Sequence, residues 1–328
     1  MTGRQPWVLV TWMDFDPEGR RTGARLRDAG LRVRLAPKTG ARDPVEMARL
    51  TGDAVAAIVS TDPFDREVIA AAGELRVIAR VGVGTDSIDL AAATEAGIVV
   101  VTTPGANRET TADHALAMIL AAIRRVVEHD ASVRRGEWRR GGDLTAWELH
   151  RTTVGLVGYG GIGRAVARRL EGFEVELLVC DPAEPRDTVG LAELLRRSDV
   201  VSLHLPLEAS TRGLIGTEEL ALMRREAVLV NTSRGGLVDE RALARALAGG
   251  RLRAAALDVF DDEPAVPASL VALPNVVLTP HIGGLSERSI ARMTERATTH
   301  VLDVLRGRPD ATAVANPAVL GRTRAAAG

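Results

Sequence analysis

Residues 153–170 read TVGLVGYGGIGRAVARRL, and this stretch decides the fold of the chain. An apolar strand leads directly into three glycines, Gly158, Gly160 and Gly163, and a helical pattern follows them. This spacing, after a strand and before a helix, is the fingerprint of a dinucleotide-binding turn. Gly158 permits the tight turn, Gly160 lets the backbone approach a pyrophosphate, and Gly163 lets the helix pack closely on the strand.

An acidic residue follows the next apolar stretch, residues 175–180. Asp181 lies roughly 20 residues beyond the last glycine, which is the spacing that the fingerprint requires. A carboxylate here accepts hydrogen bonds from the ribose hydroxyls of NAD and repels the extra phosphate of NADP. Pro182 follows, with no arginine or serine beside it to hold that phosphate. The sequence therefore predicts NAD, the alternative being that Asp181 only solubilises a strand end.

Composition narrows the class of protein. The 328 residues favour about two domains, and 42 basic against 43 acidic residues give a formal net charge of −1. This balance offers no electrostatic basis for binding nucleic acid or an anionic membrane. The single cysteine, Cys180, excludes an intrachain disulfide and fits the cytoplasm. The apolar run at 115–123 is too short to span a bilayer, so we expect small dissolved ligands.

Strand-like apolar runs alternate with helical patterns along the whole chain, which predicts parallel sheets covered by helices. Long helices are expected at about 109–125 and 286–306, and an irregular segment at 129–150. The predicted strands are residues 8–11, 31–35, 56–60, 76–81 and 98–102, followed by residues 175–180, 200–205, 227–231, 254–259 and 276–278.

We therefore predict an α/β protein with two Rossmann-like domains, each a doubly wound parallel sheet. The last helix exceeds what the second sheet needs, so it is expected to return to the first domain. Residues 1–105 and 290–328 would form a flavodoxin-like substrate domain, and residues 106–289 an inserted NAD-binding domain. A cleft between two such domains is a common ligand site.

Three segments near predicted strand ends carry groups suited to acid–base chemistry. They are NTSRGG at 231–236 with Arg234, DVFDDEP at 258–264 with Glu263, and TPHIGG at 279–284 with His281. Singly, each has an ordinary interpretation as a surface arginine, an acidic turn or a loop histidine. Ligands of open α/β sheets bind beyond the carboxyl ends of the strands, where all three are expected.

The order of these motifs resembles the D-isomer-specific 2-hydroxyacid dehydrogenase family, which includes phosphoglycerate dehydrogenase and glyoxylate/hydroxypyruvate reductase. The resemblance covers about residues 56–306. Besides the three segments and the glycine fingerprint, the motifs that carry it are RVGVG at 80–84, TPGAN at 103–107, TADH at 111–114 and HLP at 204–206.

The resemblance implies an enzyme that interconverts a 2-keto acid and a D-2-hydroxy acid with NAD. Arg234 would hold the substrate carboxylate and the C2 oxygen with its planar fork. His281 would be the general acid in reduction and the base in oxidation. Glu263 would hydrogen-bond the other ring nitrogen of His281 and favour the imidazolium form of the histidine. The N–H groups around Val83 and Gly84 would hold the other side of the carboxylate.

The same resemblance implies which residues contact NAD, with Asp258 taking the nicotinamide amide, and it implies no metal. His114, on an apolar helix, is expected to pack rather than to act. The segment at 129–150 would be a dimerisation arm, with Trp138 and Trp147 in dimer packing or, as a weaker alternative, Trp138 at the neighbouring active site. The full cofactor set is Thr111, Gly158, Gly160, Gly161, Ile162, Gly163, Asp181, His204, Thr232, Asp258, His281, Gly283 and Gly284.

Several alternatives stay open at this point. A 3-phosphoglycerate or phosphite dehydrogenase has the same fold, and a non-enzymatic, NAD(H)-sensing, corepressor-like protein keeps the same three residues. Phosphoglycerate dehydrogenases usually carry an arginine–serine pair where this chain has STDP at 60–63. The missing cation and the added Asp62 favour a small 2-keto acid such as glyoxylate or hydroxypyruvate.

Overall fold

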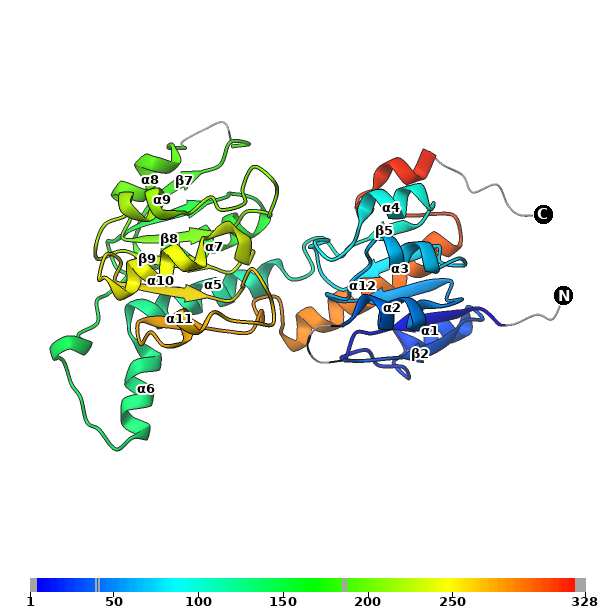
Figure 1. Ribbon diagram of the computed structural model, residues 1–328, viewed down its shortest axis with the longest axis horizontal. Helices are drawn as coiled ribbons and strands as arrows, with labels where there is room; N and C mark the ends of the chain where they lie inside the picture. The colour runs from blue at the N-terminus through cyan, green and yellow to red at the C-terminus, as the bar shows by residue number, and fades with distance from the viewer. Residues whose placement is uncertain (1–4, 39, 41, 185–187, 322–328) are drawn as a thin grey trace. The chain divides into compact units, whose positions relative to one another are not determined.

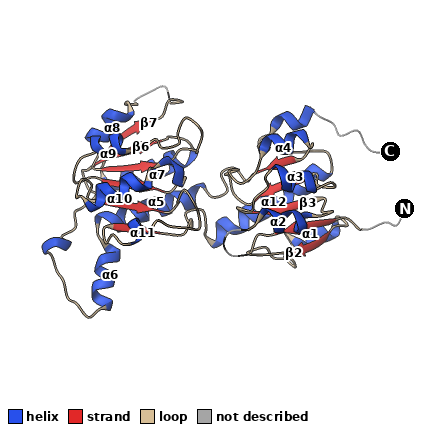
Figure 2. Ribbon diagram, in the orientation of Figure 1, coloured by secondary structure: helices blue, strands red, loops and turns tan. Residues whose placement is uncertain are grey.

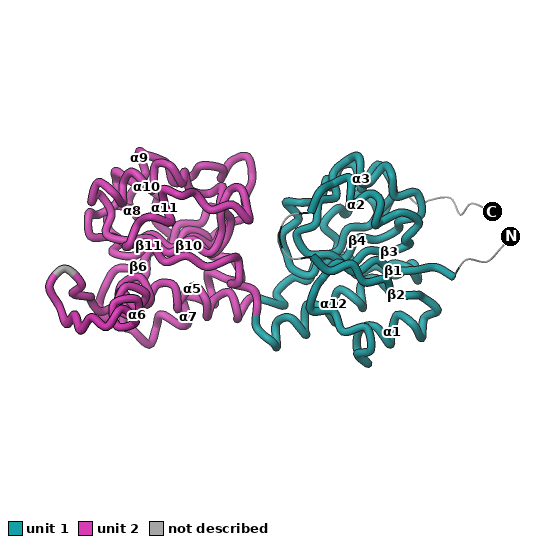
Figure 3. The backbone as a smooth tube through the Cα atoms, turned by 60° about the horizontal axis from the view of Figure 1, so that its bottom comes forward, with its two compact units in different colours: residues 1–107, 286–328 teal, residues 108–285 magenta. Residues whose placement is uncertain are grey.

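The computed structural model describes residues 5–38, 40, 42–184 and 188–321. The chain divides into two compact units (Figure 3). Unit 1 comprises residues 1–107 and 286–328, and unit 2 comprises residues 108–285. Sequence analysis placed these two crossings at 105 and 290. Unit 2 is therefore a continuous segment inserted into unit 1.

Unit 1 contains a five-stranded sheet with the strand order β2-β1-β3-β4-β5, in which every pair is parallel (Figures 1 and 2). This order is that of flavodoxin-like sheets. Its elements are β1 Trp7–Val10, α1 Gly23–Asp28, β2 Arg32–Leu35, α2 Pro44–Thr51, β3 Ala56–Val59, α3 Arg66–Ala71, β4 Val77–Arg80, α4 Leu90–Glu95, β5 Val99–Val101, α12 Glu287–Leu305 and the 3-10 helix η4 Pro317–Gly321.

Both faces of this sheet are covered. One face packs on α1 and α12, through residues such as Leu26 and Val301. The other packs on α2, α3 and α4, through residues such as Met47 and Val68. Strands covered on both sides need continuous apolar sequences, and the central strands β1 and β3 are buried along their whole length.

Unit 2 contains a six-stranded sheet with the order β11-β10-β9-β8-β6-β7, again with every pair parallel. Helices α5 and α7 cover one face, and α8 to α11 cover the other. Its elements are α5 Arg108–Ile123, α6 Val126–Arg134, η1 Gly142–Leu144, β6 Thr153–Val157, α7 Gly161–Leu170, η2 Glu171–Phe173, β7 Glu176–Cys180, α8 Leu191–Arg197, β8 Val200–Leu203, α9 Thr217–Leu222, β9 Val228–Asn231, η3 Gly235–Leu237, α10 Glu240–Ala248, β10 Ala254–Leu257, α11 Ala268–Val271 and β11 Val276–Leu278.

The predicted α/β architecture with two parallel, Rossmann-like sheets is confirmed. The expectation of an irregular segment from residue 129 was wrong at its start, because α6 runs to Arg134. Arg125 adopts a left-handed conformation with φ +53°, which ends the expected long helix and begins a new one. An ion pair at 2.7 Å between Asp130 and Arg134, four residues apart, supports this new helix.

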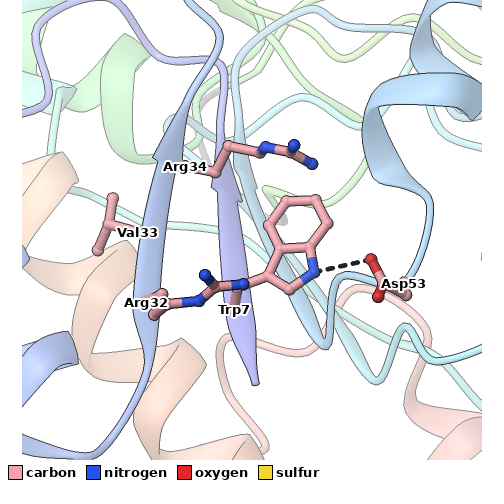
Figure 4. Close-up of a pocket in the computed structure, with 5 residues that line it drawn as sticks. All are labelled: Trp7, Arg32, Val33, Arg34 and Asp53. Carbon is pink, nitrogen blue, oxygen red and sulfur yellow. Dashed lines mark hydrogen bonds between the residues drawn. The ribbon is translucent and has the colours of Figure 1, made fainter. Parts of the chain in front are cut away.

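A hollow of about 210 Å³ lies at one edge of unit 1 (Figure 4). There the indole N–H of Trp7 donates to Asp53 at 2.9 Å, and the guanidinium of Arg34 lies 4.8 Å from the ring centroid. Trp7 and Arg32 are the first residues of β1 and β2, so the hollow lies at the amino ends of the strands. Parallel sheets bind ligands at the opposite edge, so the hollow is not where a substrate or cofactor is expected.

Candidate active site

The glycine turn of unit 2 joins β6 to α7 with little space to spare. Gly158 has φ +97°, and a Cβ there would lie 2.6 Å from the carbonyl oxygen of His204. A Cβ at Gly163 would lie 2.3 Å from the carbonyl oxygen of Gly158. Around Gly160, by contrast, a Cβ would meet nothing within 4 Å. The turn is therefore closed toward the strand and helix and open at the position expected to approach a pyrophosphate.

Asp181 lies beside this turn, directly after β7. One carboxylate oxygen accepts the backbone N–H of Tyr159 at 2.6 Å, and the other accepts that of Ala183 at 2.8 Å. The carboxylate is thus held next to the glycine residues by two backbone donors. Each oxygen can accept a further hydrogen bond, so the group can also receive the hydroxyls of a ribose.

Further polar groups at this edge have no partner within the described chain. Both ring nitrogens of His204, after β8, are buried without a hydrogen bond, as is the hydroxyl of Thr232, after β9. Burial lowers the pKa of His204 to about 4, so its ring is neutral near pH 7. Buried polar groups are normally hydrogen-bonded. Open space at Gly160, the carboxylate of Asp181 and these unpaired groups together fit a dinucleotide such as NAD.

Arg234 is presented by a tight turn after β9. The side-chain amide of the buried Asn231 donates to the carbonyl of Arg234 at 2.7 Å, and its oxygen accepts the N–H of Ser233 at 3.0 Å. Gly235 follows, where a Cβ would lie 1.9 Å from the backbone carbonyl carbon of Phe260. The turn that carries Arg234 therefore packs against the segment that leads to Glu263.

Glu263 and His281 form a hydrogen-bonded pair. The Nδ1 atom of His281 lies 2.7 Å from a carboxylate oxygen of Glu263, whose other oxygen accepts the N–H of Phe260 at 3.0 Å. Burial acts to raise the pKa of Glu263, but the His281 contact, the Phe260 N–H and the charge of Arg234 outweigh it and lower the pKa. The ionised carboxylate requires a proton on Nδ1, which leaves Nε2 to exchange protons with a ligand.

Asp258, the first residue after β10, holds the backbone turn that carries His281. His281 has φ +54°, a left-handed conformation that is uncommon for a residue with a side chain, and its N–H donates to the carbonyl of Asp258 at 2.7 Å. The carboxylate of Asp258 accepts the N–H groups of Ile282 at 2.9 Å and Gly283 at 2.8 Å. Asp258 therefore fixes the backbone of the histidine and of the two residues that follow it.

The Asp258 network extends to two side chains that sequence analysis left without a polar role. The hydroxyl of Thr279 donates to Asp258 at 2.6 Å, and Nε2 of His114 lies 3.1 Å from that hydroxyl and 3.3 Å from the carboxylate. Burial acts to raise the pKa of Asp258, but the bonds from His114, Thr279 and the two N–H groups outweigh it and lower the pKa. Thr279 stands two residues before His281, and this position in the sequence could have indicated its role near the histidine.

The remaining predicted cofactor residues are also placed in unit 2. Gly161 and Ile162 form the first turn of α7. Thr111 is buried on α5, and its methyl group lies 3.8 Å from a Cβ built on Gly283. Gly284 follows in the loop after His281. The segments after β8, β9 and β10 therefore reach one edge of the sheet together with the glycine turn, as parallel strands require.

In unit 1, Val83 and Gly84 lie in the loop after β4. The amide and carbonyl of Gly82 are both bonded to Thr103, and the guanidinium of Arg80 donates to the carbonyls of Val81 and Gly84. The backbone N–H groups of Val83 and Gly84 have no hydrogen-bond partner within the described residues. The loop thus ties its carbonyls down and keeps two donors available.

Among the described residues, no group of three or more His, Cys, Asp and Glu side chains could hold a metal ion. In the same part of the chain, every helix is too short or too polar to cross a lipid bilayer.

Comparison with known proteins identifies the family. Residues 116–283, about half of the chain, match the D-isomer specific 2-hydroxyacid dehydrogenase, NAD binding domain. A glyoxylate reductase of Korarchaeum cryptofilum is 45% identical over 259 residues, which cover 75% of this chain and 78% of that protein. The crystal structure of the TT0316 protein from Thermus thermophilus superposes with a TM-score of 0.84 at 42% identity, covering 92% of this chain and 98% of that one.

A D-3-phosphoglycerate dehydrogenase of Methanocaldococcus jannaschii is 41% identical over 251 residues, 74% of this chain. The match covers only 48% of that protein, so the chain spans about half the length of this relative. The extent of these matches, together with the glycine turn and the paired histidine and glutamate, leads to one conclusion. The chain belongs to the D-isomer-specific 2-hydroxyacid dehydrogenase family, and its unit 2 carries the NAD-binding domain of that family.

Proposed function

We propose that the protein catalyses the NAD-dependent interconversion of a 2-keto acid and a D-2-hydroxy acid. The observation that carries the proposal is the pair formed by His281 and Glu263, joined at 2.7 Å at the same edge of the unit 2 sheet as the turn that fits a dinucleotide. A histidine oriented by a carboxylate is a suitable proton donor and acceptor near neutral pH. NAD, when bound, supplies or accepts the hydride at C2 of the substrate.

The roles of the chain's own residues follow from their contacts. In reduction, Nε2 of His281 donates a proton to the C2 oxygen, and in oxidation it removes that proton. Glu263 keeps the proton on Nδ1 and stabilises the positive charge of the ring before it donates. Arg234 binds the substrate carboxylate and C2 oxygen through its planar fork. In unit 1, the N–H groups of Val83 and Gly84 are donors suited to a carboxylate oxygen.

Steady-state assays with a panel of 2-keto acids, each with NADH and with NADPH, test the proposal. We expect turnover with NADH on at least one small 2-keto acid and formation of the D-hydroxy acid. Tight NADH binding without turnover on any acid would instead favour a sensor of NAD(H).

The proposal assigns unit 1 to the substrate and unit 2 to the cofactor. It also places the protein in the cytoplasm, since its single cysteine, Cys180, fits a reducing compartment.

We further propose a homodimer built on α6 and the segment up to residue 150. In Figure 1, α6 and the connection after it leave the body of unit 2. Val126 and Val133 are 52% and 58% exposed, and Trp138 is 78% exposed. A hollow of about 450 Å³ lies between the end of α5, the start of α6 and β11, and Val127 and Glu128 are among the residues that line it. Exposed apolar residues grouped in this way are typical of a protein–protein interface.

Exchanging Val126 and Val133 together for glutamate should produce monomers, because both valines lie on one face of α6 and the charges would have to be buried in the interface. Deletion of residues 131–147 should have the same effect. Sedimentation equilibrium measures the mass. Val271→Glu, on α11, is the matched control, since this valine is 59% exposed in the same unit. A dimer that persists in the double variant would contradict the assignment of the arm.

A further inference from the structure

The carboxyl edge of the unit 1 sheet contains a second group of polar residues beside the Val83–Gly84 loop. Strand β1 is flanked by β2 on one side and β3 on the other. The strand order therefore reverses between β1 and β3. Such a switch point is where open α/β sheets bind ligands. Thr11 follows β1, and Ser60 to Asp62 follow β3, which neighbours β4.

An almost fully buried ion pair fills this switch point. Asp62 is 11% exposed, and one of its oxygens accepts Nε of Arg42 at 2.9 Å. Its other oxygen accepts the hydroxyl of Thr11 at 2.6 Å and the N–H of Ser60 at 3.2 Å. Asp62 therefore joins the ends of β1 and β3 to the segment that precedes α2.

Each of the three guanidinium nitrogens of Arg42 has a partner in this cluster. Its side chain is only 4% exposed. Besides the bond to Asp62, it donates to Glu46 at 2.7 Å and to the carbonyl of Ala36 at 2.7 Å. Glu46 also binds Lys38 at 2.8 Å, and these two cations hold its pKa below the ordinary value. Two cations and two carboxylates cancel, so Arg42 offers neither an accessible donor nor a net positive charge to a ligand.

The position of this pair matters for the substrate. Neighbouring strands lie about 4.8 Å apart, so a carboxylate bound by the loop after β4 places its C3 substituent within reach of the loop after β3. A phosphate or second carboxylate there needs a partly exposed cation to offset its desolvation. The residue that could supply one, Arg42, is already neutralised by Asp62.

We propose that the buried pair of Arg42 and Asp62 determines substrate specificity, restricting the enzyme to small 2-keto acids without a second anionic group. The inference rests on the proposed function, because it takes the loop at Val83 and Gly84 as the carboxylate site. Asp62 acts here as an internal counterion in the place where an anionic substituent of the substrate would otherwise meet Arg42.

The test compares kcat/KM for hydroxypyruvate with that for its 3-phosphate ester. The wild-type protein should prefer the unphosphorylated acid. Asp62→Ala frees Nε of Arg42 and the space of the carboxylate, so the ratio of phosphorylated to unphosphorylated kcat/KM should rise about tenfold or more, the effect of one hydrogen bond to a charged group. Glu46→Gln is the control, because it leaves the same net charge on the cluster as Asp62→Ala but keeps the carboxylate of Asp62 on Nε of Arg42. Its ratio should stay within about twofold of the wild-type value.

The outcomes separate this inference from the proposed function. Absence of turnover on every keto acid by the wild-type protein would overturn the function and the inference together. A wild-type preference for the phosphorylated acid would leave the function standing and overturn the inference. So would an unchanged ratio in an Asp62→Ala variant that retains its circular dichroism spectrum. If that variant does not fold, the wild-type preference still decides.

Discussion

Replacing His281 with alanine is expected to lower kcat for keto-acid reduction by about two to four orders of magnitude, the usual effect of a positioned general acid. The bond at 2.7 Å between its Nδ1 atom and Glu263 directs one ring nitrogen into the protein and leaves Nε2 for the substrate. Alanine removes the proton donor and keeps the backbone N–H that donates to the carbonyl of Asp258. Binding of NADH, measured by fluorescence titration, should change far less than kcat.

His150→Ala is the matched control for this experiment, because His150 is an exposed histidine of the same unit. Its kcat should equal that of the wild-type protein. A near-normal rate for His281→Ala would remove the histidine from the mechanism. A loss of NADH binding as large as the loss of kcat would mean that the turn, rather than the proton donor, had been destroyed.

Replacing Asp181 with alanine should lower kcat/KM for NADH by about tenfold or more, since a hydrogen bond to a charged group is lost. The variant should retain or gain activity with NADPH, because the charge that repels a 2′-phosphate is gone. The ratio of kcat/KM for NADH to that for NADPH should therefore fall. The contacts of Asp181 with Tyr159 and Ala183 place the carboxylate directly beside the glycine turn, which is why we expect an effect of this size.

Asp199→Ala provides the control for the cofactor experiment. Asp199 also accepts a backbone N–H, that of Thr153 at 2.9 Å, but it precedes β8 and therefore lies at the amino edge of the same sheet. Losing this carboxylate should affect stability and leave the NADH to NADPH ratio unchanged. An unchanged ratio in Asp181→Ala as well would count against the ribose role.

Local patterns predicted the parts of the protein that depend on local geometry. The turn at Gly158 and Gly163 follows from the spacing of the glycines between one strand and one helix. The parallel sheets follow from alternation of apolar runs with helical patterns. The approach of Glu263 to His281 follows once their strands are known to be parallel. The family resemblance implied their contact, and the structure gives its distance of 2.7 Å.

Contacts between distant segments were not predictable in this way. His114 and Thr279 are separated by 165 positions, and nothing local to either residue indicates that both bind Asp258. The sequence shows that Asp62 is an acidic residue near the expected substrate site. Its ion pair with Arg42 was not predictable, because it depends on how the segment before α2 returns to the strand ends. Helix α6 was missed because the sequence predicted a helix only to about residue 125 and an irregular segment from 129, whereas a new helix starts after the left-handed Arg125.

The central claim is that this chain transfers a hydride from the nicotinamide to C2 of a keto acid while His281 supplies the proton. Incubating the protein with hydroxypyruvate or glyoxylate and with NADH that carries deuterium at both C4 positions of the nicotinamide tests it most directly. Mass spectrometry and NMR of the product should show deuterium on C2, with the D configuration wherever C2 is a stereocentre. Saturated binding of the deuterated cofactor without deuterium in any product would contradict the account.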